Sequence, residues 1–304
     1  MAAEIFVYSD KAGLAAELAT LAKSMGGRAN AIALSAAEAA DLSDSDADKV
    51  YLLTGADPMP ENNARAIADF LKERGASALL VGSTMRGRDL AAQVAGFARA
   101  ALLADASDLA LTDEGLTGKR MVYGGSLVQQ ETVPGFAVAT VAAGSCEPGS
   151  GAAEMEEVSI APAGRVKVVE SKPAERSGVD LTAAKTVVAV GLGIDDEADL
   201  GMVREVAAQL DGGVGCTRSV AEDRGWFSTD EYIGISGLVL KPDLYLAVAL
   251  SGALQHMFGV REAKTIAAVN TAKDAPIFQQ ADYGIVGDYK EIMPLLLKAL
   301  KEEN

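Results

Sequence analysis

The sole histidine of this 304-residue chain, His256, follows a Ser-Gly turn at the end of an apolar run. The local sequence is Leu250-Ser251-Gly252-Ala253-Leu254-Gln255-His256. An imidazole can donate, accept or carry a proton near neutral pH, which suits it to a binding site. The run before the turn is typical of a strand, and the residues after it of a helix start. We therefore expect His256 to act on a ligand.

Further polar residues lie at the ends of other apolar runs in the same part of the chain. Asn270 ends one run, Asp288 follows another, and Arg218 and Ser236 lie in Ser- and Gly-containing turns. Each alone is an ordinary turn or surface residue. In open parallel sheets, however, ligands bind outside the carboxyl ends of the strands. The joint occurrence of these residues predicts one binding edge.

A glycine-rich turn precedes these residues and has the sequence Gly191-Leu192-Gly193-Ile194-Asp195-Asp196. It supplies two glycines of a dinucleotide fingerprint, but Asp196 occupies the third place and would repel a pyrophosphate. The match to a standard fingerprint is therefore weak. Two interpretations stay open: a phosphate site, and a tight turn that lets the backbone approach a ligand.

The sequence lacks the motifs of several other kinds of active site. The segment Gly234-Ile235-Ser236-Gly237 is not a nucleophile elbow, and Gly118-Lys119-Arg120 is not a P-loop. With one histidine and two scattered cysteines, Cys146 and Cys216, we expect neither a transition-metal site nor a disulfide framework. The cysteine usage favours a reducing, cytoplasmic location.

The composition of the chain excludes some classes of binding partner. Hydrophobic residues make up 49% of the chain, its formal net charge is −16 and its pI is about 4.5. We expect no binding to nucleic acid or to an anionic membrane, because phosphates are bound by clustered Lys and Arg. The chain opens on a strand-like run and contains no stretch of 18 apolar residues. We therefore expect no signal peptide and no membrane insertion.

The first half of the chain alternates expected strands with expected helices, which predicts an α/β fold with a parallel sheet covered on both faces. The strands are expected at 5–8, 29–34, 49–53 and 77–81, and the helices at 12–24, 62–74 and 89–99. Short β-like runs follow and predict an antiparallel extension of this domain. They lie at 109–111, 119–123, 137–142, 158–160 and 166–169.

A polar segment at 170–184 predicts the crossing between two domains, 1–183 and 184–304. A second α/β unit follows it. Strands are expected at 185–190, 214–216, 244–250 and 265–269, and helices at 200–210, 253–258 and 289–301.

Five sequence blocks, in this order, resemble the alpha subunit of electron-transfer flavoproteins. They are Gly215–Arg218, Ile233–Gly237, Leu244–His256, Thr265–Asn270 and Ala275–Asp288. The first half is also similar to the family at Arg86–Ala91 and Met121–Gly125, so the resemblance covers nearly the whole chain. Ser219–Glu222 and Tyr232–Ser236 most resemble the Fix-type branch, which is associated with electron delivery in carnitine reduction or nitrogen fixation.

The resemblance implies the alpha subunit of a heterodimer, an electron carrier rather than a substrate-converting enzyme. FAD would lie in a C-terminal Rossmann-like domain, and the N-terminal domain would pack on an electron-transfer flavoprotein beta subunit. Electrons would pass between a donor and an acyl-CoA dehydrogenase-like or quinone-reductase-like partner. The implied cofactor-binding positions are Arg218, Ser219, Ile235, Ser236, Ser251, Gly252, Gln255, His256, Asn270 and Asp288.

At the ring end of the cofactor, the resemblance places Arg218 beside the isoalloxazine, Ser236 near N5 and His256 near the N1–C2=O region. Flavin reduction puts negative charge on that region, which a permanently charged guanidinium would stabilise. A histidine there would donate a hydrogen bond and take up a proton as the charge develops.

At the adenosine end, the resemblance implies Asn270 and Asp288, with Lys264 near a phosphate or ribose. Two positions depart from the family pattern. Leu192 stands where many members have arginine, and Ile235 where many have glutamine. Two alternatives remain open: a stand-alone NAD-binding oxidoreductase and a non-redox nucleotide-binding module.

Overall fold

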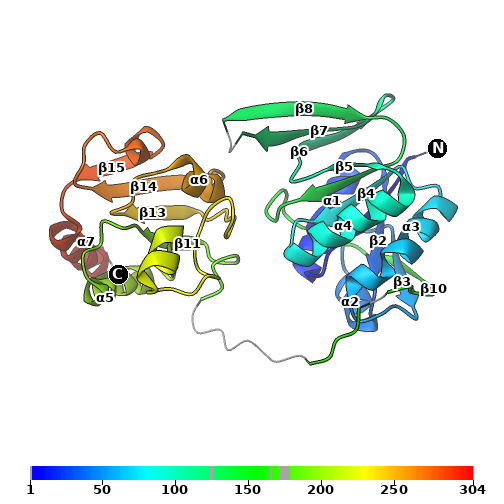
Figure 1. Cartoon of the computed structure of the whole chain (residues 1–304), viewed down its shortest axis with the longest axis horizontal. Coiled ribbons are helices and arrows are strands. Elements are labelled where there is room, and N and C mark those ends of the chain that lie inside the picture. Colours follow the sequence, from blue (N-terminus) through cyan, green and yellow to red (C-terminus); the bar gives the residue numbers. More distant parts are fainter. Residues whose placement is uncertain (1, 124–125, 165, 171–178, 304) are drawn as a thin grey trace. The chain divides into compact units, whose positions relative to one another are not determined.

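The computed structural model describes residues 2–123, 126–164, 166–170 and 179–303. The chain divides into two compact units, residues 1–172 and 173–304 (Figure 1). The domain boundary expected between residues 183 and 184 stays a prediction. Among the described residues, no helix combines the length and the apolar character needed to cross a membrane.

The first unit is built on a seven-stranded sheet in which every pairing is parallel. Its central strands are mostly apolar and are buried beyond their first residues because both faces of the sheet are covered. In sheet order the strands are β10 (Glu154–Ser159), β3 (Lys49–Thr54), β2 (Arg28–Ala33), β1 (Glu4–Tyr8), β4 (Ala78–Gly82), β9 (Ala137–Val141) and β5 (Ala101–Leu103).

Helices cover both faces of this sheet (Figure 1). Side chains alternate along each strand, so Val7 packs with α1 (Ala12–Ser24) and α2 (Ala36–Asp41) on one face. Its neighbour Phe6 packs on the other face with α3 (Ala64–Glu73), which follows a 3₁₀ turn at Pro60–Asn63, and with α4 (Met85–Ala98). The expected covered parallel sheet is thereby confirmed.

A separate antiparallel sheet consists of β6 (Ser107–Thr112), β7 (Gly115–Val122) and β8 (Leu127–Val133). It confirms the extension expected at 109–111 and 119–123, although β8 was not expected. The runs at 137–142 and 158–160 were wrongly assigned to it. They form β9 and β10 of the parallel sheet, because pairing with β4 and β3 is decided by long-range contacts.

The expected strand at 166–169 is also wrong, since residues 166–170 have no regular secondary structure. Val169 is 99% exposed, so no sheet face buries this apolar run. A side-chain hydrogen bond from Asn62 to the carbonyl of Val166 ties the segment to the first unit.

The second unit is built on a five-stranded parallel sheet of doubly wound, Rossmann-like type. Its strand order within the unit is 2-1-3-4-5, so the order reverses between β11 and β13. In sheet order the strands are β12 (Gly213–Cys216), β11 (Thr186–Val190), β13 (Leu244–Val248), β14 (Thr265–Asn270) and β15 (Tyr283–Val286). The edge strand β15 lies in the apolar run that was expected to precede Asp288, although no strand bounds were predicted for it. It is exposed along its length and so carries no pattern of burial.

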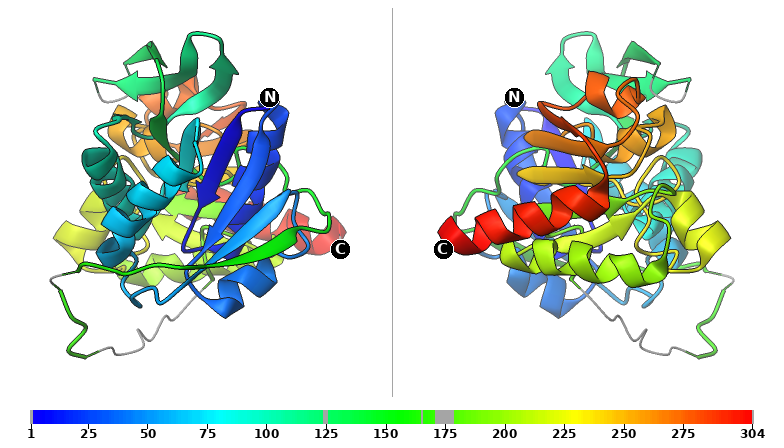
Figure 2. Two further views of the ribbon diagram at one scale, coloured as in Figure 1. Left: turned by 90° about the vertical axis from the view of Figure 1, so that its right-hand side faces the viewer. Right: turned by 90° about the vertical axis from the view of Figure 1, so that its left-hand side faces the viewer.

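Two helices lie side by side on one face of this sheet, α5 (Leu200–Gln209) and α7 (Tyr289–Glu303) (Figure 2). Val188 and Val190 of β11 pack towards them. Val187 faces the opposite side, where the core includes Met257 of the short helix α6 (Leu254–Met257). With both faces closed, the carboxyl edge of the sheet is where a ligand is expected to bind.

Candidate functional site

A cavity of about 860 Å³ lies at the carboxyl ends of the strands of the second unit. The turns after β11 and β13 both line it, so it opens where the strand order reverses. Its volume is within the usual range for cofactor and small-molecule sites. The structure brings together here nine of the ten positions expected to bind the cofactor: Arg218, Ser219, Ile235, Ser236, Ser251, Gly252, Gln255, His256 and Asn270.

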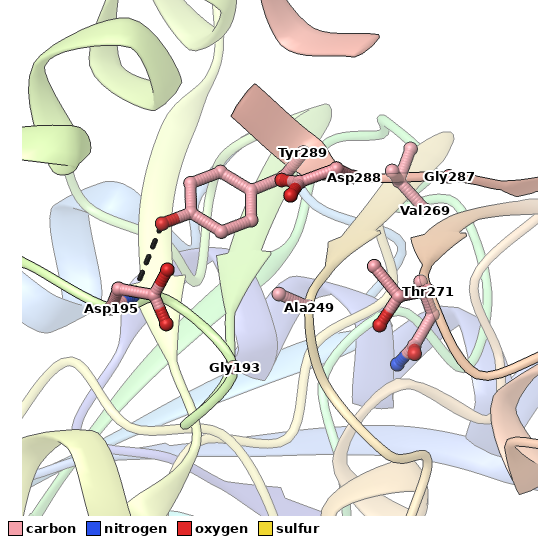
Figure 3. A pocket seen from close by; sticks show the side chains of 9 residues that line it. Gly193, Asp195, Ala249, Val269, Thr271, Gly287, Asp288 and Tyr289 are labelled. Carbon is pink, nitrogen blue, oxygen red and sulfur yellow. Dashed lines mark hydrogen bonds between the residues drawn. The ribbon is translucent and has the colours of Figure 1, made fainter. Parts of the chain in front are cut away.

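The tenth position, Asp288, lies in a smaller adjoining cavity of about 190 Å³. Figure 3 shows it with Asp195, Thr271 and Tyr289 around this space. The two cavities share three lining residues, Gly193, Ala249 and Asn270. An elongated ligand can therefore place one end in each.

The glycines of the turn after β11 are needed for a close approach to the turn after β13. A Cβ on Gly191 would lie 2.4 Å from Cα of Leu250, and one on Gly193 would lie 2.8 Å from the carbonyl oxygen of Ala249. Both glycine amides donate within the protein, to the carbonyls of Val248 and Ala249. The structure therefore favours a tight turn over a phosphate-binding loop at these two amides.

The carboxylate of Asp196, which occupies the third glycine position of the dinucleotide fingerprint, forms a hydrogen bond with the backbone two residues further on. It accepts a 2.9 Å hydrogen bond from the amide of Ala198 and so caps the short 3₁₀ turn Glu197–Asp199. This is the ordinary role of an aspartate at the start of a helical turn.

Arg218 lies at the mouth of the large cavity with its side chain 61% exposed. Its Nε donates to Oε2 of Glu222 at 2.7 Å, one turn further along the chain. This carboxylate raises the pKa of Arg218, so the guanidinium stays charged. Because the pairing uses Nε, the guanidinium retains its terminal N–H groups for a ligand.

The turn that carries Ser236 is held from two sides. Tyr232 donates from Oη to the Ser236 carbonyl at 2.7 Å, and the Ile235 amide donates to the Gln255 carbonyl at 2.8 Å. Gly234 has φ of +144°, and a Cβ there would lie 2.8 Å from the same Gln255 oxygen. The turn is thus a fixed part of the cavity wall.

His256 is buried, and both of its ring nitrogens have protein partners. Nδ1 lies 2.9 Å from the carbonyl of Ile233, and Nε2 lies 2.5 Å from Oη of Tyr245. Burial lowers the pKa of His256 to about 4, although its hydrogen bond to Ile233 acts in the opposite direction. The expectation that His256 donates to a ligand and takes up a proton stays a prediction.

Asn270 and Asp288 are anchored at the edge where they were expected. Asn270 donates to the Leu250 carbonyl at 2.9 Å and accepts from the Ala272 amide, which joins the turns after β13 and β14. Asp288 accepts from the Lys290 amide with one carboxylate oxygen.

Lys264 does not belong to this site, and the expectation for it is wrong. It immediately precedes β14 and pairs with Asp243, which immediately precedes β13, at 2.6 Å. Both lie at the amino end of the sheet, so the length of a strand, roughly 20 Å, separates them from the carboxyl edge.

A network beside the small cavity was not anticipated from the sequence. Tyr289 Oη donates to Asp199 at 2.6 Å and accepts from the Asp195 amide at 3.1 Å, and the latter bond is drawn in Figure 3. Lys290 pairs with Asp195 at 3.0 Å. The bond from Tyr289, followed by the charge of Lys290, lowers the pKa of Asp199. The network fixes the loop after Gly193 to α7, and no local spacing reveals it.

Comparison with known families agrees with this geometry. The electron transfer flavoprotein domain matches residues 12–175, and the electron transfer flavoprotein FAD-binding domain matches residues 180–261. The chain belongs to the electron-transfer flavoprotein alpha-subunit family. It is 39% identical over 305 residues to "Protein FixB" of Salmonella typhimurium, covering 97% of each chain. It is 37% identical over 306 residues to "Protein FixB" of Escherichia coli O157:H7, covering 98% of each.

The chain is therefore the Fix-type alpha subunit of an electron-transfer flavoprotein, with an FAD-binding domain and a beta subunit as its heterodimeric partner. The residues present fit FAD. The large cavity presents a guanidinium and hydroxyl groups, which suit the carbonyl edge of a flavin, and the small cavity presents a carboxylate, which suits ribose hydroxyls. The alternatives of an NAD-binding oxidoreductase and a non-redox module are not favoured.

Proposed function

We propose that this alpha subunit holds the isoalloxazine ring of FAD in the large cavity and the adenosine end in the small one. The observation that carries the proposal is that the two cavities adjoin and share Gly193, Ala249 and Asn270 as lining residues. Bound FAD supplies one-electron and two-electron redox chemistry. The chain itself binds the ring, orients it and provides charge around it.

At the ring end, Arg218 provides a fixed positive charge and Ser236 a hydroxyl group. Arg218 is charged in every redox state, so it stabilises negative charge on the ring without exchanging a proton. The turn that carries Ser236 is held by Tyr232 and Gln255, which positions the hydroxyl before the cofactor binds.

At the adenosine end, Asp288 has one carboxylate oxygen engaged by the Lys290 amide. We assign the other oxygen to a ribose hydroxyl group. The side-chain amide of Asn270 donates one hydrogen bond to the protein and accepts one from it. It therefore keeps one N–H group and one lone pair for the cofactor.

The heterodimer passes its electrons to or from an acyl-CoA dehydrogenase-like or quinone-reductase-like protein. The Fix-type sequence blocks support this class of partner. A cytoplasmic location is supported by the thiols Cys146 and Cys216, which are both free.

The test is to co-express the chain with its beta subunit and to titrate the purified complex anaerobically with dithionite. Flavin absorption bands that bleach on reduction, with one FAD per heterodimer in these cavities, are the expected result. A colourless complex that also fails to take up added FAD would overturn the proposal. Stopped-flow mixing of the reduced complex with candidate dehydrogenases then identifies the redox partner.

A further inference from the structure

Both carboxylates that line the small cavity are held by one residue, Lys290. Asp195 lies in the loop after β11, and Asp288 lies directly before α7, so they belong to two different walls. The backbone amide of Lys290 donates to Oδ1 of Asp288 at 2.8 Å, and its Nζ lies 3.0 Å from Oδ2 of Asp195. The ammonium group offsets the charge of Asp195, whereas the neutral amide leaves the charge of Asp288 in place.

Tyr289 links the same two walls. It begins α7, directly after Asp288, and is 5% exposed. Its Oη accepts from the Asp195 amide at 3.1 Å and donates to Oδ2 of Asp199 at 2.6 Å (Figure 3 shows the first of these bonds). Burial, followed by the bond to Asp199, raises the pKa of Tyr289, so its hydroxyl stays protonated and can donate. One side chain thus fixes the spacing between α7 and the loop.

The loop that Tyr289 and Lys290 hold is acidic. Nζ of Lys290 lies 3.0 Å from Asp195 and 3.5 Å from Asp199. The hydrogen bond to Asp195 raises the pKa of Lys290, against the opposing effect of burial, so the ammonium group stays charged. Gly193, two residues before Asp195, lines both cavities. An anion placed between the cavities would therefore be repelled by Asp195 if the ammonium group were absent.

We propose that Tyr289 and Lys290 are positioning residues for the adenosine end of the cofactor. Tyr289 sets the spacing between the two walls of the small cavity. Lys290 offsets the charge of Asp195, which would otherwise repel the diphosphate of FAD, and leaves Asp288 as the carboxylate that binds the ribose. Their effect on FAD rests on the proposed function, whereas the hydrogen bonds and ion pairs themselves belong to the chain alone.

Tyr289→Phe tests the spacing, because it removes the hydroxyl group and retains the buried ring. The Asp195 amide then loses its acceptor, and the loop is released from α7. The measurements are the dissociation constants of the flavin-free heterodimer for FAD and for FMN, which has the same ring but no adenosine. We expect FAD to bind about fivefold to tenfold more weakly and FMN to stay within about twofold of the wild type. An equal loss for both ligands, or no loss for either, would overturn the proposal.

Lys290→Gln tests the charge. The backbone amide remains, so the bond to Asp288 is kept, while Asp195 loses its counter-charge. We expect FAD to bind about threefold to fivefold more weakly at low salt, a modest effect because this pair is exposed to solvent. The difference from the wild type should shrink as salt is added. A loss that is the same at every salt concentration would overturn the proposed role of Lys290.

A second substitution, Asp195→Asn in the Lys290→Gln background, separates charge from packing. The double variant has no carboxylate at position 195 that needs to be offset. We therefore expect its FAD affinity to return to within about twofold of the wild type. If Lys290 acted only by packing, the second substitution would restore nothing, and that result would overturn the proposal.

Two residues outside the cavities provide matched controls, Tyr283→Phe and Lys298→Gln. Tyr283 is 70% exposed on β15, and Lys298 lies on α7 and pairs with Glu302 at 3.8 Å. Neither Tyr283 nor Lys298 lines the small cavity or the large one. Each control loses the same chemical group as its test variant, so both should bind FAD and FMN as the wild type does.

The bond from the Asp195 amide to Tyr289 can be observed without any cofactor. Amide hydrogen exchange of the flavin-free heterodimer is followed in the segment that contains Asp195. We expect this amide to exchange about tenfold faster in Tyr289→Phe than in the wild type. Unchanged exchange would overturn the proposal even if FAD binds. A heterodimer that takes up no FAD, but shows the faster exchange in the variant, would refute the proposed function alone.

Discussion

Nε of Arg218 lies 2.7 Å from Oε2 of Glu222, so the Arg218 guanidinium at the mouth of the large cavity is paired within its own helical turn. The side chains of both residues are exposed to solvent, at 61% and 37%. The pairing orients the guanidinium and offsets part of its charge. The effective charge at the mouth of the large cavity is therefore set by two residues of opposite sign.

Replacement of Arg218 by alanine should lower the first one-electron potential of the bound flavin. Loss of a charge-assisted hydrogen bond corresponds to roughly 60–130 mV for one electron. Spectroelectrochemical titration of the heterodimer measures the shift. Arg65→Ala is a matched control, because Arg65 also pairs with a carboxylate four residues on, Asp69, but lies in the first unit. An unchanged potential in an FAD-loaded Arg218→Ala protein would remove Arg218 from this role.

Replacement of Glu222 by glutamine should shift the same potential in the opposite direction. The neutral amide can still accept from Arg218 but no longer offsets its charge. Because this pair is exposed and screened, we expect a rise of only roughly 10–40 mV, smaller at high salt. A fall in potential would mean that Glu222 acts mainly by orienting the guanidinium and not through its charge.

Leu192→Arg should strengthen FAD binding. Leu192 is 49% exposed in the lining of the large cavity, at the position where many family members have arginine. A guanidinium there can pair with the cofactor's diphosphate, and we expect about fivefold to tenfold tighter binding that weakens as salt is added. Leu192→Met introduces an unbranched apolar side chain without the charge and should bind as the wild type does. Equal affinities of the two variants would argue that the diphosphate lies elsewhere.

Gly252→Ala should destabilise the second unit. Gly252 has φ of +79°, and a Cβ would lie 2.4 Å from the backbone nitrogen of Ile277, which donates to Ser251. Left-handed backbone strain and the clash together cost about 2–4 kcal/mol. Urea unfolding measures the change. Gly201→Ala is the control, since a Cβ there meets nothing within 4 Å and α5 should gain about 0.5–1 kcal/mol.

The stability of the second unit should fall between pH 7 and pH 4 through the titration of His256. Its pKa is lowered from 6.5 to about 4 in the folded chain, mainly by burial. The unfolded chain therefore binds more protons in this window, and the folded state loses stability as the pH falls through it. The free energy of unfolding falls by about 3 kcal/mol through this titration, and the fall is complete below pH 4.

The comparison with His256→Asn isolates this contribution from the carboxylates that titrate over the same range. Unfolding free energies of both proteins are measured by urea at several pH values. As the pH is lowered, we expect the unfolding free energy of the wild type to fall further than that of the variant, and the difference should be about 3 kcal/mol. Parallel curves would show that the ring is accessible to protons in the native state.

Much of the fold could be predicted because it depends on local patterns. Short apolar runs predicted β1, β4, β11 and β14, and amphipathic segments between them predicted most of the helices. The pattern did not show where a strand joins its sheet. β9 and β10 pair in parallel with β4 and β3, which are distant in the sequence, so the short apolar runs were assigned to the wrong sheet. The edge strand β15 has no buried face, so its apolar run was noticed before Asp288 but its bounds were not predicted.

The sequence by itself determined which residues would gather at the binding edge. Arg218, Ser251 and Asn270 follow expected strands, and the carboxyl ends of parallel strands share one edge of a sheet. Only the tertiary structure decided what these side chains do there. His256 is engaged by Tyr245 and the Ile233 carbonyl because β13, α6 and a distant turn converge on the ring, and a hydrogen bond depends on positions in space that no local spacing encodes.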